Sequence, residues 1–351
     1  MRARGLQRAR RRRRLILLTL LLFLLLLLPL SLALGPYRAS PLEVLRVLLH
    51  PDGSPLSTVV WDLRLRRALA AVVVGAVLGI SGTAVQSCMR NPLASPFTFG
   101  LAHAASLGVA VALLLMHAGA VGRFALSIYN PFLVSASAFL FSLLQVLLIL
   151  LLAHRAGLDA RALVLSAIAL SFAYQSFLYL LQYFVLNEIM VSTVIFWTFG
   201  DLGRIGWLEL EILLLSSLLI LPYFLYRGPD YDLMIAGDEL TRSSGTSPER
   251  VRLESVIMAA LGTALATSFA GIIGFVCLVA PHASRLLVGG GHRYLLPTSA
   301  VMGSLLLLLS DTVGRTVIAP TVIPVGIMTS LIGSPLLVYL LLRGGRRGGQ
   351  D

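Results

Sequence analysis

The sequence has 351 residues, of which 57% are hydrophobic and only 13% charged, with a mean hydropathy of +0.89. A soluble core cannot hide so much apolar surface, so the composition excludes an ordinary soluble domain and predicts an all-α integral membrane protein in contact with lipid. The formal net charge of +12 does not indicate nucleic-acid binding, because the arginines flank apolar runs and no basic domain with interleaved aromatic residues is present.

The N-terminal part begins with an arginine-rich tail, residues 1–14, followed by the uncharged run Leu15–Leu34. A secretory signal has the same order of parts, but its apolar region is usually only about 7–15 residues long. We therefore interpret this run as a retained first membrane span. A short amphipathic helix is expected near Pro41–His50.

The rest of the chain alternates between apolar runs and short polar connections. Further spans are expected at about residues 68–89, 97–117, 131–153, 162–186, 207–226, 251–270, 272–288, 294–318 and 325–342. Residues 187–206 are too broken for a full span and predict a short re-entrant helix followed by a loop. The sequence thus predicts one transmembrane domain, residues 15–343, with about ten helices, and a polar tail at residues 344–351.

The distribution of arginine predicts the orientation. Most of the 28 basic residues, all of them arginine, fall in the two tails and in the connections on the same side as the N-terminus. Positively charged connections stay in the cytoplasm. Both termini and the polar segment Arg227–Glu254 are therefore expected to be cytoplasmic.

The segment Arg227–Glu254 is the longest strongly polar run between two apolar segments. Its residues predict two short helices. Asp238 suits the first turn of one, which Gly245 would end in a left-handed conformation. Ser247 and Pro248 are typical of the start of the next. A simple connection would not need helices, so we interpret the segment as a docking surface.

Small residues and the cysteines are assigned to packing. The run GAVLGISG at Gly75–Gly82 places small residues four apart, which lets two membrane helices approach closely. Cys88 and Cys277 lie in apolar spans far apart in the sequence, so neither a disulfide framework nor a metal site is expected.

Four motifs carry a family resemblance. They are GISGTAVQSCMRNPLASPFTFG, GFVCLVAPHASRLLVGGGHRYLLP, LLLLSDTVGRTVIAP and IPVGIMTSLIGSPLLVYLLLR. With them the chain, from Leu15 to Arg343, resembles the FecCD and cobalamin permeases, the membrane subunits of bacterial and archaeal ABC importers for iron-siderophore, haem and cobalamin. The resemblance implies a type II ABC importer permease in a prokaryotic cell membrane.

The same resemblance implies the partners. These are a second copy of the chain in a homodimer, two cytoplasmic ATPase subunits that use ATP and Mg, and an external substrate-binding protein. No cofactor or metal is expected on the chain itself. The residues agree, because a chain without lysine cannot supply the lysine of a nucleotide-binding P-loop.

Several site residues follow from the resemblance. The contact with the ATPase is expected at Gly237, Asp238, Glu239, Leu240, Thr241, Arg242, Ser243, Ser244 and Gly245, although family members usually have a hydrophobic residue in place of Ser244. Arginines that grip glutamates of the binding protein match Arg64, Arg67 and Arg315. A gate on the cytoplasmic side matches Asn91, Leu93, Asp159 and Ala160.

Further residues were assigned from their chemistry. His103, a histidine within a span, is a candidate contact for cargo, or else bonds to a backbone carbonyl. Asp311 and Arg315 are spaced to pair with each other on one helix. Arg66 is expected to anchor at the headgroup boundary. Residues Asn187–Trp197 and the final span are expected to line the path.

The alternatives concern cargo and mechanism. A ferric siderophore or related metal chelate is the first choice, with haem or cobalamin as the alternative. A passive channel would not need the helical segment Arg227–Glu254. An intramembrane enzyme would need paired acids, a Ser–His pair or a His-Glu-x-x-His motif within the spans, and the sequence suggests none of these.

Overall fold

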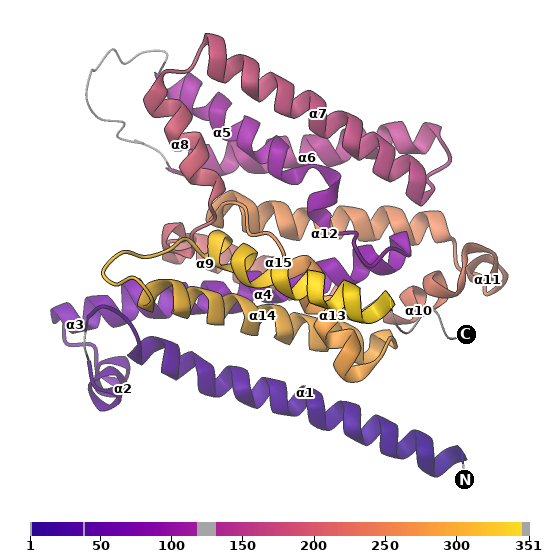
Figure 1. Cartoon of the computed structure of the whole chain (residues 1–351), viewed down its shortest axis with the longest axis horizontal. Coiled ribbons are helices and arrows are strands. Elements are labelled where there is room, and N and C mark those ends of the chain that lie inside the picture. The colour runs from indigo at the N-terminus through magenta and orange to yellow at the C-terminus, as the bar shows by residue number, and fades with distance from the viewer. Residues whose placement is uncertain (1, 38, 118–130, 346–351) are drawn as a thin grey trace.

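The chain forms a bundle of helices that run roughly parallel or antiparallel to one another (Figure 1). The computed structural model describes residues 2–37, 39–117 and 131–345, and within these ranges there are helices and no strands. The long helices are α1 (Arg2–Ala33), α4 (Arg66–Met89), α5 (Leu101–His117), α6 (Pro131–Arg155), α7 (Ala160–Phe184), α9 (Trp207–Tyr226), α12 (Pro248–Ala270), α13 (Val276–Val288), α14 (His292–Thr316) and α15 (Val325–Gly345).

Shorter helical segments connect the long ones. They are α2 (Pro41–Leu49), α3 (Pro55–Thr58), a π-helical stretch η1 (Val59–Leu65), the 3₁₀ turns η2 (Pro96–Phe99) and η3 (Leu202–Arg204), α8 (Glu188–Thr198), α10 (Gly228–Ala236) and α11 (Asp238–Ser243). Among the described residues, 7 helices are long and apolar enough to cross a membrane, and α5, α8, α13 and α15 contain shorter apolar helices. These confirm the predicted all-α membrane architecture of about ten spans.

The helix boundaries differ from the predicted ones most clearly in α1 and α13. Helix α1 continues through most of the basic tail instead of starting at Leu15. Helix α13 starts only at Val276, because residues 271–275 are extended or turn-like. The predicted short helix after span five is present as α8, and the predicted amphipathic helix is present as α2, which Ser40 and Glu43 close with a capping box.

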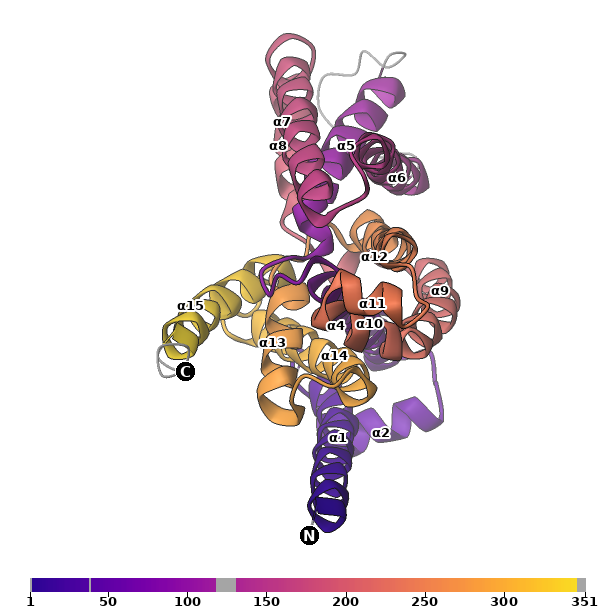
Figure 2. The same cartoon turned by 90° about the vertical axis from the view of Figure 1, so that its right-hand side faces the viewer.

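Helix α4 is the centre of the bundle. It packs on α14, α13, α12 and α9, whereas α1 lies outside against α14 (Figures 1 and 2). Helices α5 to α8 form a second group, and α12 lies between this group and α4 (Figure 2). The N-terminal end of α1 and the C-terminal end of α15 point to the same side as α10 and α11 (Figure 1). We call this side the hairpin end, after the helical hairpin that α10 and α11 form.

The glycines of α4 allow its close contact with α14 and α13. A Cβ atom added to Gly75 would lie 2.4 Å from the carbonyl oxygen of Gly303, and one added to Gly79 would lie 2.2 Å from that of Ser299. A Cβ on Gly82 would lie 2.0 Å from the Cys277 carbonyl oxygen. The predicted role of this glycine run in helix packing is therefore confirmed.

A buried ion-pair network fastens the end of the bundle opposite the hairpin. Asp311 of α14 is fully buried and accepts hydrogen bonds from Arg67 of α4, at 2.5 Å, and from Arg315, at 2.9 Å. Arg67 also contacts Asp201 at 2.9 Å. Arg315 donates to the carbonyl oxygen of Ser31 in α1. Two buried guanidinium groups thus share one buried carboxylate, and α1, α4 and α14 are joined.

Gly79→Ala is expected to destabilise the bundle by about 1–3 kcal/mol, because the added methyl group forces two backbones apart. Gly290→Ala, in a loop where an added Cβ meets nothing within 4 Å, is the matched control. Thermal unfolding in lipid nanodiscs measures both. Equal midpoints for the two variants would contradict the close contact between α4 and α14.

Asp311→Ala is expected to lower the stability by about 3–5 kcal/mol, since it leaves two buried arginines without their shared counter-charge. Asp201→Asn should cost much less, because the Asp201 side chain is 31% exposed and pairs with Arg67 alone among the described residues. Folded yield and thermal midpoint measure the effect. Normal yield of Asp311→Ala would show that Arg67 and Arg315 find other partners.

Candidate functional site

Helices α10 and α11 form a compact hairpin between α9 and α12. Gly237 separates them with φ +122°, and Gly245 follows α11 with φ +83°, both in a region that L side chains rarely adopt. The Ser247 hydroxyl accepts the Arg250 N–H, and Pro248 occupies the first turn of α12. The predicted end at Gly245 and start at Ser247 are therefore confirmed. The second predicted short helix is instead the first turn of α12, and α10 was not predicted.

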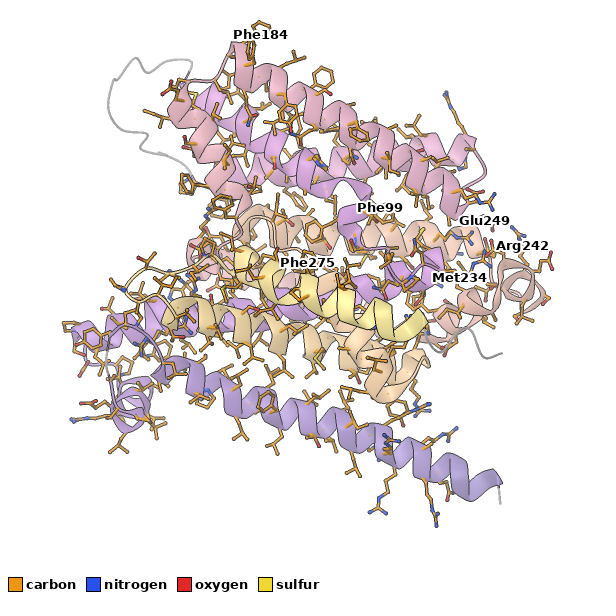
Figure 3. All side chains as sticks on the ribbon, in the orientation of Figure 1. Phe99, Phe184, Met234, Arg242, Glu249 and Phe275 are labelled. Atoms are coloured by element: carbon orange, nitrogen blue, oxygen red, sulfur yellow. The ribbon has the colours of Figure 1, made fainter. Side chains whose placement is uncertain are left out.

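The outer face of the hairpin is exposed and carries both polar and apolar side chains. Of the residues matched to the ATPase contact, Thr241 is buried, Gly237 and Asp238 are half-buried, and Glu239, Leu240, Arg242, Ser243, Ser244 and Gly245 are exposed. Two apolar side chains stand among the polar ones, with Ile235 47% and Leu240 49% exposed. Arg242 pairs with Glu249 across the hairpin, and this contact raises the pKa of Arg242 (Figure 3).

The inner face of the hairpin is anchored in the bundle. Tyr231 and Met234 of α10 are fully buried, and the Tyr231 hydroxyl lies 2.9 Å from the Ser255 hydroxyl of α12. Figure 3 shows Met234 at the junction of the hairpin with the bundle. These contacts attach the hairpin to the helices beneath it.

Asp238 binds a buried arginine that also reaches α4. Both of its carboxylate oxygens accept from Nη2 of Arg252, at 2.6 and 2.7 Å, and Arg252 is only 2% exposed. Nε of Arg252 donates to the Cys88 carbonyl oxygen at 3.3 Å. Arg90, which ends α4, lies 3.4 Å from the same carboxylate of Asp238. The start of α11 is thus tied to the last turn of α4.

A second polar chain starts six positions earlier, at Asp232 of α10. Its Oδ1 accepts the backbone N–H of His292 at 3.1 Å and lies 2.7 Å from His292 Nδ1. Nε2 of His292 lies 2.6 Å from the Ser87 hydroxyl of α4. In a neutral imidazole Nδ1–H donates to the Asp232 carboxylate, and the single proton of the Ser87 hydroxyl then has two acceptors within reach, His292 Nε2 and the Thr83 carbonyl oxygen at 2.8 Å.

This Ser–His pair contradicts the sequence-based expectation that the spans contain none. Ser87 and His292 are separated by 205 positions, so no local motif indicates them. The pair is not arranged for hydrolysis. His292 is fully buried and Ser87 is 1% exposed, which leaves no room for a substrate at the hydroxyl.

The residues matched to the gate lie in two turns near the hairpin end. Asn91 directly follows α4, and its Oδ1 accepts the Leu93 N–H at 2.9 Å. Asp159 caps α7 by accepting the Ala162 N–H. Ala160 packs against the apolar cluster that also contains Ala94, three residues after Asn91. The fold therefore brings the two turns to one cluster, and their gating role stays a prediction.

The three arginines matched to the binding-protein contact are buried in this structure. Arg64, Arg67 and Arg315 are 3%, 8% and 5% exposed. Arg64 donates to the carbonyl oxygen of Leu32, and the other two pair with Asp311. The predicted Asp311–Arg315 pair is confirmed. All three guanidinium groups thus have partners within the chain. The docking role itself stays a prediction.

An open groove lies between the end of α8, the α12–α13 connection and α15. It has a volume of about 660 Å³ and is lined by Thr198, Phe199, Ile272, Gly274, Phe275, Gly326, Ile327, Ser330, Leu331, Ser334 and Pro335. Phe275 has φ +65°, an uncommon conformation for an aromatic residue, at the point where α13 begins (Figure 3). The final span lines this groove, and α8 contributes only its C-terminal end. That these segments line the path stays a prediction.

His103 lies elsewhere, in α5, and is not among the residues that line this groove. Its Nδ1 is buried without a hydrogen-bond partner in the described part of the chain. The expected backbone carbonyl partner is therefore not found for this nitrogen. Contact between His103 and cargo stays a prediction.

Comparisons with known proteins agree with this architecture. The model of the FecCD transport family matches residues 21–343. A Methanocaldococcus jannaschii protein assigned as an ABC transporter permease is 40% identical over 90% of this chain and 91% of its own length. The hemin transport system permease protein HmuU of Yersinia pestis is 33% identical over 89% of this chain and 92% of its own.

A solved structure of an inward-facing metal-chelate type ABC transporter superposes with a TM-score of 0.79 at 27% identity, over 94% of this chain and 99% of the other. With this fold and with a family match over residues 21–343, the chain belongs to the FecCD transport family of membrane permeases.

Proposed function

We propose that the chain is the membrane subunit of a binding-protein-dependent ABC importer. Two copies would form the path between them, with the groove beside α15 on the shared axis. Two separate ATPase subunits would bind the hairpin ends, where both termini would be cytoplasmic. An external protein would deliver cargo to the opposite end, and hydrolysis of ATP would switch the path between outward and inward access.

The hairpin is the observation that carries this proposal. A connection between two spans needs only a few residues, whereas α10 and α11 form a folded unit that exposes Ile235 and Leu240 to the surroundings. Exposed apolar side chains among charged ones are typical of a protein contact. Family members usually have a hydrophobic residue at the position of Ser244. In this chain the exposed side chain of Leu240 would supply the apolar contact instead.

The proposed cargo is a ferric siderophore or a related metal chelate. The relatives include the iron(3+)-hydroxamate permease FhuG of Bacillus subtilis and the Fe(3+) dicitrate permease FecD of Escherichia coli. The groove lining is mostly apolar with three hydroxyl groups, from Thr198, Ser330 and Ser334, which suits loose passage of a bulky chelate. Haem is the second candidate, favoured by the similarity to HmuU.

Docking of the binding protein at Arg64, Arg67 and Arg315 would require an exchange of partners. Asp201, 31% exposed, is the outermost acid on Arg67. A glutamate of the docked protein could take its place, since a guanidinium group holds one carboxylate as well as another. The inner acid, Asp311, would keep the arginines in position during this exchange.

Leu240→Asp is expected to lower the recovery of the ATPase with the purified chain at least about tenfold, because the substitution removes about 1.4 kcal/mol or more from an apolar contact. Leu45→Asp, on α2 at the opposite end, is the matched control, since Leu45 has a similar exposure of 52%. Unchanged recovery with Leu240→Asp would place the ATPase contact elsewhere.

Uptake into vesicles tests the whole function. The chain with its ATPase should import a labelled ferric chelate only with internal ATP and an external, loaded binding protein. Passage without ATP, down the gradient of the chelate, would instead establish the passive channel. Replacing the chelate by haem tests the second candidate.

A further inference from the structure

Two polar chains connect the hairpin to the same turn of α4. One runs from Asp232 through His292 to Ser87, and the other runs from Asp238 through Arg252 to the Cys88 carbonyl. Each starts on a different short helix and passes through a buried side chain from a third helix, α14 or α12. Both nevertheless end on adjacent residues of α4.

Both polar chains end next to the turn that carries Asn91 and Leu93. Ser87 and Cys88 are followed within three residues by Asn91, and Asn91 is bonded back to the carbonyl oxygen of Gln86 in the same turn. The side chain of Asn91 in turn fixes Leu93, which is 44% exposed. A shift of the last turn of α4 must therefore shift the turn that carries Asn91 and Leu93.

We propose that Asp232–His292–Ser87 and Asp238–Arg252–Cys88 form a coupling relay that carries movement of the hairpin to the turn at Asn91–Leu93. This inference rests on the proposed function, since the ATPase would move the hairpin. Asp232, Asp238, His292, Arg252 and Ser87 are positioning residues that act through α4, without touching cargo or nucleotide.

The contacts suit transmission of movement better than apolar packing would. Each link is short and directional, between 2.6 and 3.3 Å, and its central residue is at most 2% exposed. Breaking such a link leaves a buried charge or imidazole unsatisfied, so the relay moves as one unit.

The turn at Asn91–Leu93 can report the relay directly. A Leu93→Cys reporter would be labelled by a polar maleimide in the lipid-embedded complex with its ATPase, without nucleotide and with ATP and vanadate. Native Cys88 and Cys277 are buried, at 0% and 1% exposure, so the chain without the reporter gives the blank. We expect nucleotide to change the labelling rate by at least about fivefold, as for an ordinary coupling between sites.

Ser87→Ala breaks one link far from the ATPase face, and Arg252→Gln weakens the other at a buried residue outside the predicted ATPase contact. Each variant is expected to reduce the ratio of the labelling rates measured with and without nucleotide. Together they should bring this labelling ratio to about one. Ser81→Ala is the matched control. It removes the same hydroxyl from α4 at a fully buried position whose Oγ has no hydrogen-bond partner in the described residues.

The outcomes separate three accounts. If Ser87→Ala and the double variant lose the ratio while they retain the ATPase and its basal hydrolysis, the relay is supported. If both variants unfold at a lower temperature yet keep the full labelling ratio, the two polar chains only stabilise the fold, and the relay is wrong. If the unsubstituted reporter shows no response to nucleotide, the proposed function fails. Should Ser87→Ala not fold, Asp232→Asn breaks the same link at its half-exposed end.

Discussion

The backbone contact between α4 and α14 is the constraint on which the rest of the structure depends. With Gly75, Gly79 and Gly303 at their crossing, the two helices meet without side chains between them. In lipid this contact is stabilised by dispersion forces and not by the expulsion of water, so it requires close approach. It fixes α4 along its length and presents the two ends of this helix to polar partners from other helices.

Both ends of α4 meet buried charges, but with different surroundings. At one end Arg67 shares Asp311 with Arg315, in a closed network that joins α1, α4 and α14. At the other end the carboxylates belong to the hairpin and are partly exposed, 49% for Asp232 and 24% for Asp238. One end is thus fastened internally, whereas the other is attached to a surface that a partner can reach. This asymmetry is what an importer driven from one side requires.

The sequence predicted those features that depend on local composition. Hydropathy located the spans, the glycine spacing of α4 predicted its close packing, and Gly245, Ser247 and Pro248 marked the ends of the hairpin helices. It missed α10, whose N-terminus has no side-chain cap, although Pro229 and Asp230 in its first turn are typical of a helix start.

Long-range polar partners could not be predicted from one sequence. His292 and Arg252 are ordinary residues near helix starts until folding places them beside α4. Likewise, the motif that matched Arg64, Arg67 and Arg315 to docking contained no indication that the side chains are buried and paired. Prediction and structure agree that the start of α1, the end of α15 and the hairpin lie at the same end of the bundle (Figure 1).

The central claim is that the hairpin receives the work of an ATPase for a transport cycle. The most direct measurement is the rate of ATP hydrolysis by the purified complex in lipid, with and without binding proteins loaded with candidate chelates. The account predicts that one loaded protein stimulates hydrolysis and thereby identifies the cargo. A rate that is the same with every loaded protein, or a chain that never retains an ATPase, would contradict it.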